Sequence, residues 1–133
     1  MENLSGQAIK GYELHERIGV GGFGAVYRAY QPTIKRDVAM KIILPEFANH
    51  PDFIRRFEFE AQLVARLEHL HIVPLYDFWR DPQGAYLVMR WLRGGNLRNR
   101  LRSGRISPPH VVQIIDQVAS ALAAAHRRSV VHR

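Results

Sequence analysis

The sequence predicts an α+β fold in which a five-stranded antiparallel sheet carries one long helix and further helices follow. Two observations lead to this prediction. Short apolar runs separated by glycine and proline turns occupy residues 12–44 and 73–91, which is typical of antiparallel strands. Apolar residues recur at helical spacing over residues 51–68 and 108–128. The composition, 47% hydrophobic and 23% charged over 133 residues, fits one globular domain.

The five expected strands are Tyr12–Val20, Ala25–Tyr30, Asp37–Leu44, Val73–Trp79 and Ala85–Trp91. The first three are expected to form an antiparallel meander, because only a glycine cluster and a turn at Pro32 separate them. The last two flank the sequence Asp81-Pro82-Gln83-Gly84, whose turn-forming residues predict a hairpin.

Three helices are expected, over residues 51–68, 97–102 and 108–128. In the first, phenylalanine and aliphatic residues recur four, seven and three positions apart and form one stripe that faces a core. The last follows Ser107, a favourable N-cap, and begins at Pro108. It is apolar on so many sides that it requires neighbours on most of them.

The composition also excludes several kinds of site. Without cysteine, the chain has no disulfide, no zinc–thiolate site and no cysteine nucleophile. No apolar stretch is long enough to span a bilayer, and the first residues do not form a secretory signal. We therefore expect a cytoplasmic domain without a membrane segment.

Residues 19–26 carry the most informative motif, Gly-Val-Gly-Gly-Phe-Gly-Ala-Val. The spacing of its glycines also occurs in dinucleotide-binding folds, where a helix follows the loop directly. Here the alternating run Ala25–Tyr30 follows, which favours a strand–loop–strand flap. Glycines in such a flap let the backbone approach phosphate oxygens while Phe23 covers them. A merely flexible hairpin turn is the alternative.

Lys41 is the only charge within the apolar run Val38–Leu44, and a lysine buried there requires an anion. Glu60 falls in the middle of the apolar stripe of the 51–68 helix, whereas Glu58 points elsewhere. We therefore predict an ion pair between Lys41 and Glu60 beside the phosphate flap. A snorkelling lysine at a sheet edge and a purely structural ion pair are the alternatives.

With these motifs in this order, and Val131-His132-Arg133 at the end, the sequence resembles the protein kinases, particularly bacterial serine/threonine kinases of the eukaryotic-like type. The resemblance extends over nearly the whole chain from about Tyr12. It implies the N-terminal part of a kinase domain. Residues 1–11 would form an N-terminal extension, residues 12–92 the N-lobe with the ATP-binding loop, and residues 93–133 the start of the helical C-lobe.

The resemblance also implies roles for individual residues. Lys41 would contact the α- and β-phosphates of ATP, held in place by Glu60, and these two would be the catalytic residues of this chain. The nucleotide would lie between the glycine loop, the upper wall of the adenine pocket, a gatekeeper methionine and the hinge. The implied cofactor-binding residues are Ile18, Gly19, Val20, Gly21, Gly22, Phe23, Gly24, Val26, Ala39, Lys41, Met89, Arg90, Trp91 and Leu92.

The activity implied for a complete domain is phosphorylation of serine or threonine in a protein substrate, with ATP and Mg²⁺ as cofactors. His132-Arg133 resembles the opening of the catalytic loop, whose next residue would be the base. The magnesium-binding motif would also follow beyond these residues. We therefore expect no metal site within the chain, and an ATP-binding fragment that is inactive alone.

Two alternatives from other classes of protein remain. A non-catalytic kinase-like binding module is the first, although such modules often lose the residues that correspond to Lys41 and Glu60. The second is nucleic-acid binding by the arginine-rich run Arg90–Arg105, since residues 90–133 carry nine arginines and one acid within a net charge of +7. Three leucines give that run a packing face, so we expect no nucleic-acid partner.

Overall fold

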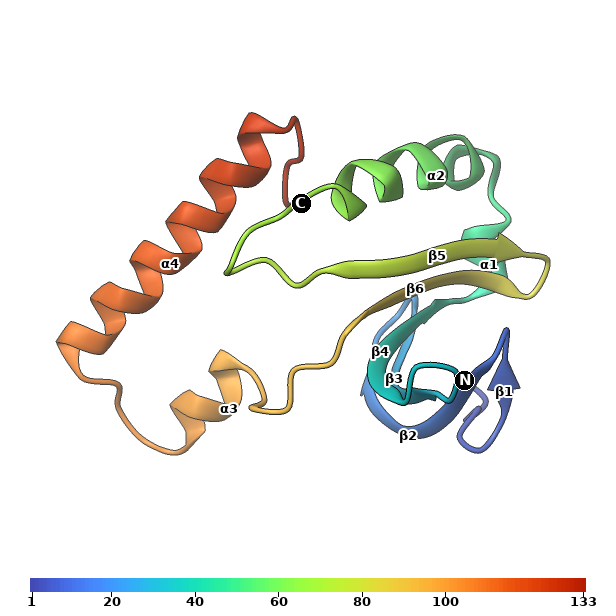
Figure 1. Cartoon of the computed structure of the whole chain (residues 1–133), viewed down its shortest axis with the longest axis horizontal. Helices are drawn as coiled ribbons and strands as arrows, with labels where there is room; N and C mark the ends of the chain where they lie inside the picture. The colour runs from blue at the N-terminus through green and yellow to red at the C-terminus, as the bar shows by residue number, and fades with distance from the viewer.

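A six-stranded antiparallel sheet is the centre of the computed structural model, which describes all 133 residues (Figure 1). Its strands are β1 (Ala8–Ile9), β2 (Tyr12–Val20), β3 (Gly24–Gln31), β4 (Arg36–Ile43), β5 (Leu75–Asp81) and β6 (Gly84–Arg90). They lie in the order β1-β2-β3-β4-β6-β5, and every neighbouring pair is antiparallel. The predicted α+β class with an antiparallel sheet is therefore confirmed.

The sheet has one strand more than the five predicted. Lys10 and Gly11 both adopt positive φ angles, 48° and 83°, and the chain reverses there. The two residues of β1 can then pair with the start of β2, so that the sheet extends into residues 1–11. The other five strands begin and end within two residues of their predicted bounds.

One face of the sheet forms the hydrophobic core. Alternation along β4 places Val38, Met40 and Ile42 on this face, and all three are buried. The other fully packed members are Tyr12, Leu14, Ala25, Tyr27, Ala29, Tyr86 and Val88. At the edge of the core, the Trp79 ring stacks on two tyrosine rings, with centroids 6.0 and 4.9 Å away.

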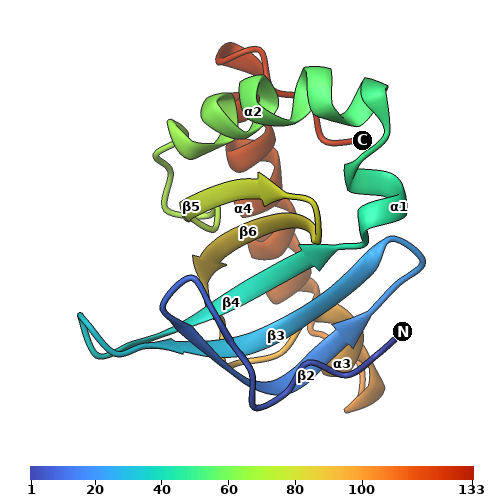
Figure 2. The same ribbon diagram turned by 90° about the vertical axis from the view of Figure 1, so that its right-hand side faces the viewer.

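Four helices complete the chain: α1 (Pro45–Ala48), α2 (Pro51–Ala65), α3 (Leu97–Arg102) and α4 (Pro108–Arg127). Figure 2 shows α2 lying along the β5 side of the sheet, where the two elements are in contact. α3 is preceded by the N-cap residue Asn96, whose side chain accepts a hydrogen bond from the Asn99 amide at 2.8 Å. The three predicted helices therefore occur in the predicted order, the first before β5 and the other two after β6.

α2 begins at Pro51, as predicted, because proline suits a first helical position and the ring of His50 accepts a hydrogen bond from the backbone N–H of Asp52. It ends at Ala65 rather than at residue 68. The amide of Arg66 bonds to a carbonyl three residues back, which tightens and closes the last turn.

The short helix α1 is absent from the sequence prediction. Pro45 ends β4, as expected, but it also occupies the first position of a helical turn whose Ala48 is fully buried against the sheet. Four residues carry too little periodicity to indicate a helix. α1 therefore joins the end of β4 to the start of α2 as an ordered element.

α4 lies away from the sheet in Figure 1 and exposes much apolar surface. The side chains of Val112, Ile115 and Val118 are 58%, 60% and 52% exposed. One contact joins α4 to the segment that follows α2: the Ser120 hydroxyl lies 3.0 Å from the ring of His69. None of the helices combines the length and the hydropathy that a membrane-spanning segment needs.

We expect Met40→Ala to destabilise the fold by about 2–5 kcal/mol, because it opens a cavity at a position with no exposed surface in the middle of the core. Urea unfolding followed by tryptophan fluorescence measures this loss. Ile34→Ala, at a side chain 54% exposed between β3 and β4, is the control and should change the free energy of unfolding by less than about 0.5 kcal/mol. Equal losses in the two variants would contradict the assignment of the core face.

Candidate functional site

The sheet face opposite to the core brings together residues from β3, β4 and β6. In the register of these strands, Lys41 lies between Val26 on one side and Leu87 on the other, and Ala39 pairs with Met89. We call this surface, defined by Val26, Ala39, Lys41, Leu87 and Met89, the open face. Four of the predicted nucleotide-binding residues therefore lie side by side on adjacent strands.

The glycine loop projects from one end of the open face, between β2 and β3. The residue after the loop continues directly into a strand, as predicted, so the loop is a strand–loop–strand flap. The amide of Gly21 donates to the Gly24 carbonyl at 2.9 Å and closes the turn. A side chain on Gly24 would overlap the Ile42 carbonyl oxygen, whereas space around Gly21 and Gly22 is open. Glycine is thus required for strand packing at Gly24 and leaves backbone accessible at the other two positions.

The two branched residues of the predicted site on β2 lie beside the flap. Ile18 falls in an irregular stretch of the β2–β3 register between Arg17 and Gly19, and its side chain is 47% exposed. Val20, next to the loop, is 62% exposed. Gly19 pairs with Val26 and so shares the open face. The predicted residues of β2 therefore border the site at its flap end.

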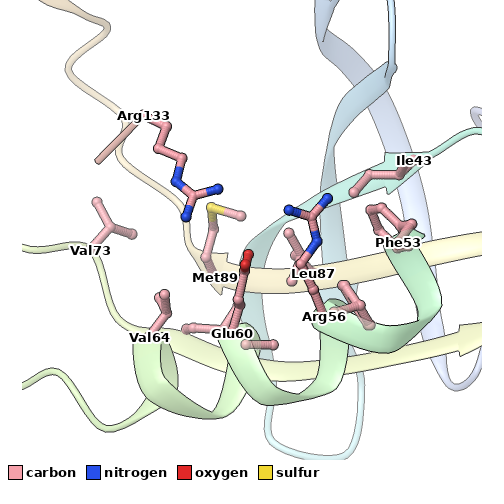
Figure 3. A pocket seen from close by; sticks show the side chains of 12 residues that line it. Ile43, Phe53, Arg56, Glu60, Val64, Val73, Leu87, Met89 and Arg133 are labelled. Carbon is pink, nitrogen blue, oxygen red and sulfur yellow. The ribbon is translucent and has the colours of Figure 1, made fainter. Parts of the chain in front are cut away.

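Two hollows adjoin the open face, and Lys41 lines one of them. One, of about 500 Å³, lies between the flap tip, the end of β4, α1 and the start of α2, and Phe23, Lys41 and Phe47 are among its lining residues. The other, of about 370 Å³, lies between α2 and the sheet and is mostly apolar (Figure 3). Glu60 and Met89 line this second hollow. A site with a polar, cation-bearing end and an apolar end therefore adjoins the open face.

The predicted burial and pairing of Lys41 are not found. Lys41 is exposed at the first hollow, Glu60 is exposed at the second, and no ion pair joins them. The physical reason is that α2 packs against β5 and leaves both hollows open to water beside β4. A solvated charge has no desolvation penalty that a partner must offset, so each side chain remains unpaired.

Arg56 is a residue of the site that the sequence analysis missed. It lines both hollows and rises from α2 beside Glu60 (Figure 3). Its guanidinium Nε donates to the Asp52 carbonyl at 3.3 Å within the same helix. The available signal was its spacing, because a residue four positions before Glu60 shares the same helix face. Arg56 adds a second cation to the polar hollow that Lys41 lines, where the carboxylates of Glu46 and Asp52 also lie.

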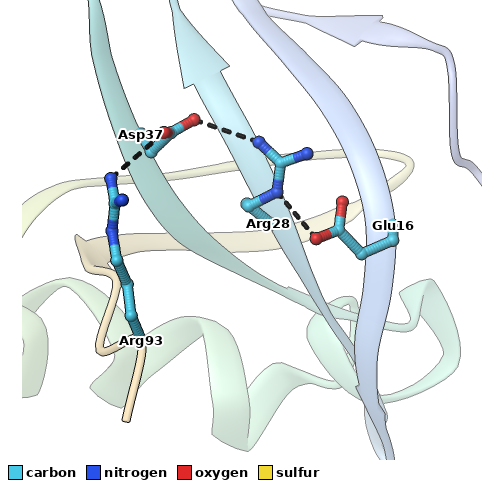
Figure 4. A network of polar contacts seen from close by, with 4 residues as sticks. All are labelled: Glu16, Arg28, Asp37 and Arg93. Atoms are coloured by element: carbon cyan, nitrogen blue, oxygen red, sulfur yellow. Dashed lines mark hydrogen bonds and ion pairs between the residues drawn. The ribbon is translucent and has the colours of Figure 1, made fainter.

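The predicted hinge, Arg90 to Leu92, leaves the end of β6 and is held by an ionic network (Figure 4). Arg28 of β3 donates to Glu16 of β2 at 2.7 Å and to Asp37 of β4 at 3.2 Å. Asp37 also pairs with Arg93 at 3.5 Å. The guanidinium groups of Arg28 and Arg93 lie 5.5 and 4.8 Å from the ring centroid of Trp91.

This network fixes charge at the hinge end of the sheet. The hydrogen bond from Arg28 lowers the pKa of the Glu16 carboxyl, and the same bond raises the pKa of the guanidinium. Each contact is at least partly exposed and contributes modestly alone, but together they join three strands to the segment that follows β6. The network therefore holds Trp91 against the sheet.

The residues present fit an adenine nucleotide. Val26, Ala39 and Met89 supply an apolar surface for a base, and the open backbone of Gly21 and Gly22 lies at the end of the face where Lys41 supplies a cation. No group of three or more histidine, aspartate or glutamate side chains is arranged to hold a metal ion. The open face thus offers an apolar surface of the kind a base requires and, at its flap end, a cation of the kind phosphate requires.

Comparisons with known proteins agree with this geometry. A family model described as the protein kinase domain matches residues 12–133. The chain is 38% identical over 132 residues to the serine/threonine-protein kinase PrkC of Bacillus subtilis, and 37% identical over 133 residues to PknE of Mycobacterium bovis. These matches cover 98% and 99% of the chain but 20% and 24% of the two relatives.

Solved structures show the same fold. A crystal structure of a variant of the PknI kinase domain from Mycobacterium tuberculosis matches with a TM-score of 0.88 and 29% sequence identity. The match covers 100% of this chain and 55% of that one. The chain therefore spans about half of that solved kinase domain, and a smaller share of the curated relatives.

We expect Gly24→Ala to lower the thermal unfolding midpoint by several degrees, because the added methyl group meets the backbone of β4 and must displace it. Gly22→Ala is the matched control in the same loop, where nothing lies within 4 Å of the new Cβ. It should leave the midpoint almost unchanged. Differential scanning calorimetry measures both variants, and a larger loss for Gly22→Ala would show that the loop packs differently.

Proposed function

The chain belongs to the protein kinase family, and on that premise we propose that it supplies the ATP-binding part of a serine/threonine protein kinase. The complete protein would transfer the terminal phosphoryl group of ATP to a serine or threonine of a protein substrate. The observation that carries this proposal is the position of Lys41, between Val26 and Leu87 on the open face and beside the glycine flap.

The residues of the open face have separable tasks. Val26, Ala39 and Met89 would bind the adenine ring, with the backbone of residues 90–92 along its edge. The amides of the flap and the Lys41 ammonium would bind the phosphates. When bound with Mg²⁺, ATP supplies the phosphoryl group that is transferred. The flap and Lys41 orient it and Phe23 excludes water.

Lys41 and Glu60 would act as a pair when the nucleotide is bound. Both side chains border the site but do not meet, so pairing requires α2 to approach β4. Kinases require such a lysine–glutamate ion pair for activity. In the proposed mechanism, the open separation is a resting arrangement in which Lys41 is free to meet phosphate.

Four acids follow α2, namely Glu68, Asp77, Asp81 and Asp116, and no three of them form a group that could hold a metal ion. Asp77 accepts a hydrogen bond from Tyr12 at 3.5 Å, and Asp81 accepts one from Tyr86 at 3.3 Å. Burial, together with the charge of Asp81, raises the pKa of Tyr86 to about 12. Asp116 lies within α4. We therefore propose that these 133 residues bind nucleotide without transferring phosphate by themselves.

We expect Lys41→Met to weaken ATP binding to the chain about tenfold, since it removes the cation beside the flap while leaving the apolar base surface intact. Isothermal titration calorimetry measures the affinity. Lys35→Met is the control, because Lys35 lies in the exposed turn between β3 and β4. If the two variants bind ATP equally well, the phosphates do not lie at Lys41 and the proposed site is wrong.

We expect no phosphotransfer when the purified chain is incubated with Mg²⁺, labelled ATP and a generic protein substrate. The reaction needs a carboxylate that orients the acceptor hydroxyl and further ligands for magnesium. Turnover that persists after repurification, and that disappears in Lys41→Met, would place the catalytic groups within these residues and contradict the proposal.

A further inference from the structure

The tip of the glycine flap rests on an aromatic side chain outside the expected nucleotide site. The ring of Phe23 meets the ring of Phe47 edge to face, with centroids 4.8 Å apart and planes inclined by 64°. Phe23 is otherwise 66% exposed. In the same place, the Phe23 carbonyl accepts a hydrogen bond from the Leu44 amide at 2.9 Å. One side-chain contact and one backbone bond therefore join the flap tip to α1 and its N-cap.

The position of Phe47 is fixed because the two residues that follow it in α1 and at its end are buried or hydrogen-bonded. Ala48, the next residue, has no exposed surface. Asn49, at the end of α1, donates to the Pro82 carbonyl at 3.1 Å and accepts from Arg80 at 3.1 Å, both at the β5–β6 hairpin. α1 is thus a short helix held in place between the sheet and α2. The side chain of Phe47 contacts the flap from this helix.

Phe47 also lines the polar hollow together with Phe23 and Lys41. A flap that left Phe47 would open this hollow, and a flap that rests on Phe47 lies beside the Lys41 ammonium. The aromatic contact therefore lies at the end of the site near Lys41, where we propose that the phosphates bind. It is distant in the sheet register from the proposed base surface, where Ala39 pairs with Met89.

We propose that Phe47 is a positioning residue that holds the flap through Phe23 and thereby raises the affinity for the phosphate part of the nucleotide. The inference rests on the proposed function, since it assumes that phosphates bind under the flap. An edge-to-face aromatic pair adds a modest stabilisation, so the expected effect is a several-fold change. The effect is selective, because the flap tip would contact the phosphates, whereas adenosine would lie on Val26, Ala39 and Met89.

The test compares ATP and adenosine binding by calorimetry, and the amide order parameters of Gly21, Gly22 and Gly24 by NMR relaxation, in the 133-residue chain. In Phe47→Ala, we expect about fivefold weaker ATP binding, unchanged adenosine binding and lower order parameters. Phe47→Tyr, which keeps the ring, should behave like the unmodified chain. Phe47→Leu, which keeps apolar bulk, should retain the fold and still weaken ATP binding.

Phe59→Ala is the matched control, because Phe59 is 66% exposed on α2 and lines neither hollow. Unchanged order parameters in both Phe47→Ala and Phe47→Leu would overturn the inference, as would a parallel loss of ATP and adenosine binding. If the unmodified chain binds no ATP, the proposed function itself fails. The relaxation data from the same samples then decide separately whether Phe47 holds the flap.

Discussion

The alternation of side chains along β4 is the constraint on which both the core and the site depend. β4 is bonded to β3 on one side and to β6 on the other, so its register is fixed from both edges. Met40 enters the core with no exposed surface, and Lys41 points to the opposite face. A slip of one residue would exchange these two side chains and destroy core and site together. One strand therefore supplies both a core residue, Met40, and a residue of the candidate site, Lys41.

The open face is held at its two ends by different forces. At the flap end, Phe23 packs on Phe47 and the Gly24 backbone lies tightly against β4. At the hinge end, charged groups hold the segment after β6 against the sheet, since Asp37 pairs with two arginines that also lie beside Trp91. Packing thus orients the part of the site where we propose that phosphate binds, and electrostatics orients the segment that follows β6.

Elements could be predicted from the sequence wherever a residue pattern depends directly on local backbone geometry. Five strands, the flap and the starts of the long helices follow from alternation, glycine spacing and proline positions. The pairing of Lys41 with Glu60 could not be predicted in the same way, because helical spacing gives the face of a side chain but not how far the helix stands from the sheet. α1, and with it the contact of Phe47 with Phe23, could not be predicted because a four-residue helix leaves no periodic signal.

We propose that a nucleotide binds on the open face beneath the flap. The most direct measurement is an ATP titration of the ¹⁵N-labelled chain followed by amide chemical shifts. We expect the shifts to concentrate at residues 19–26, at Lys41 and at residues 89–92. Shifts confined to the exposed arginines of α3 would instead indicate non-specific anion binding, and would contradict the assignment of the site.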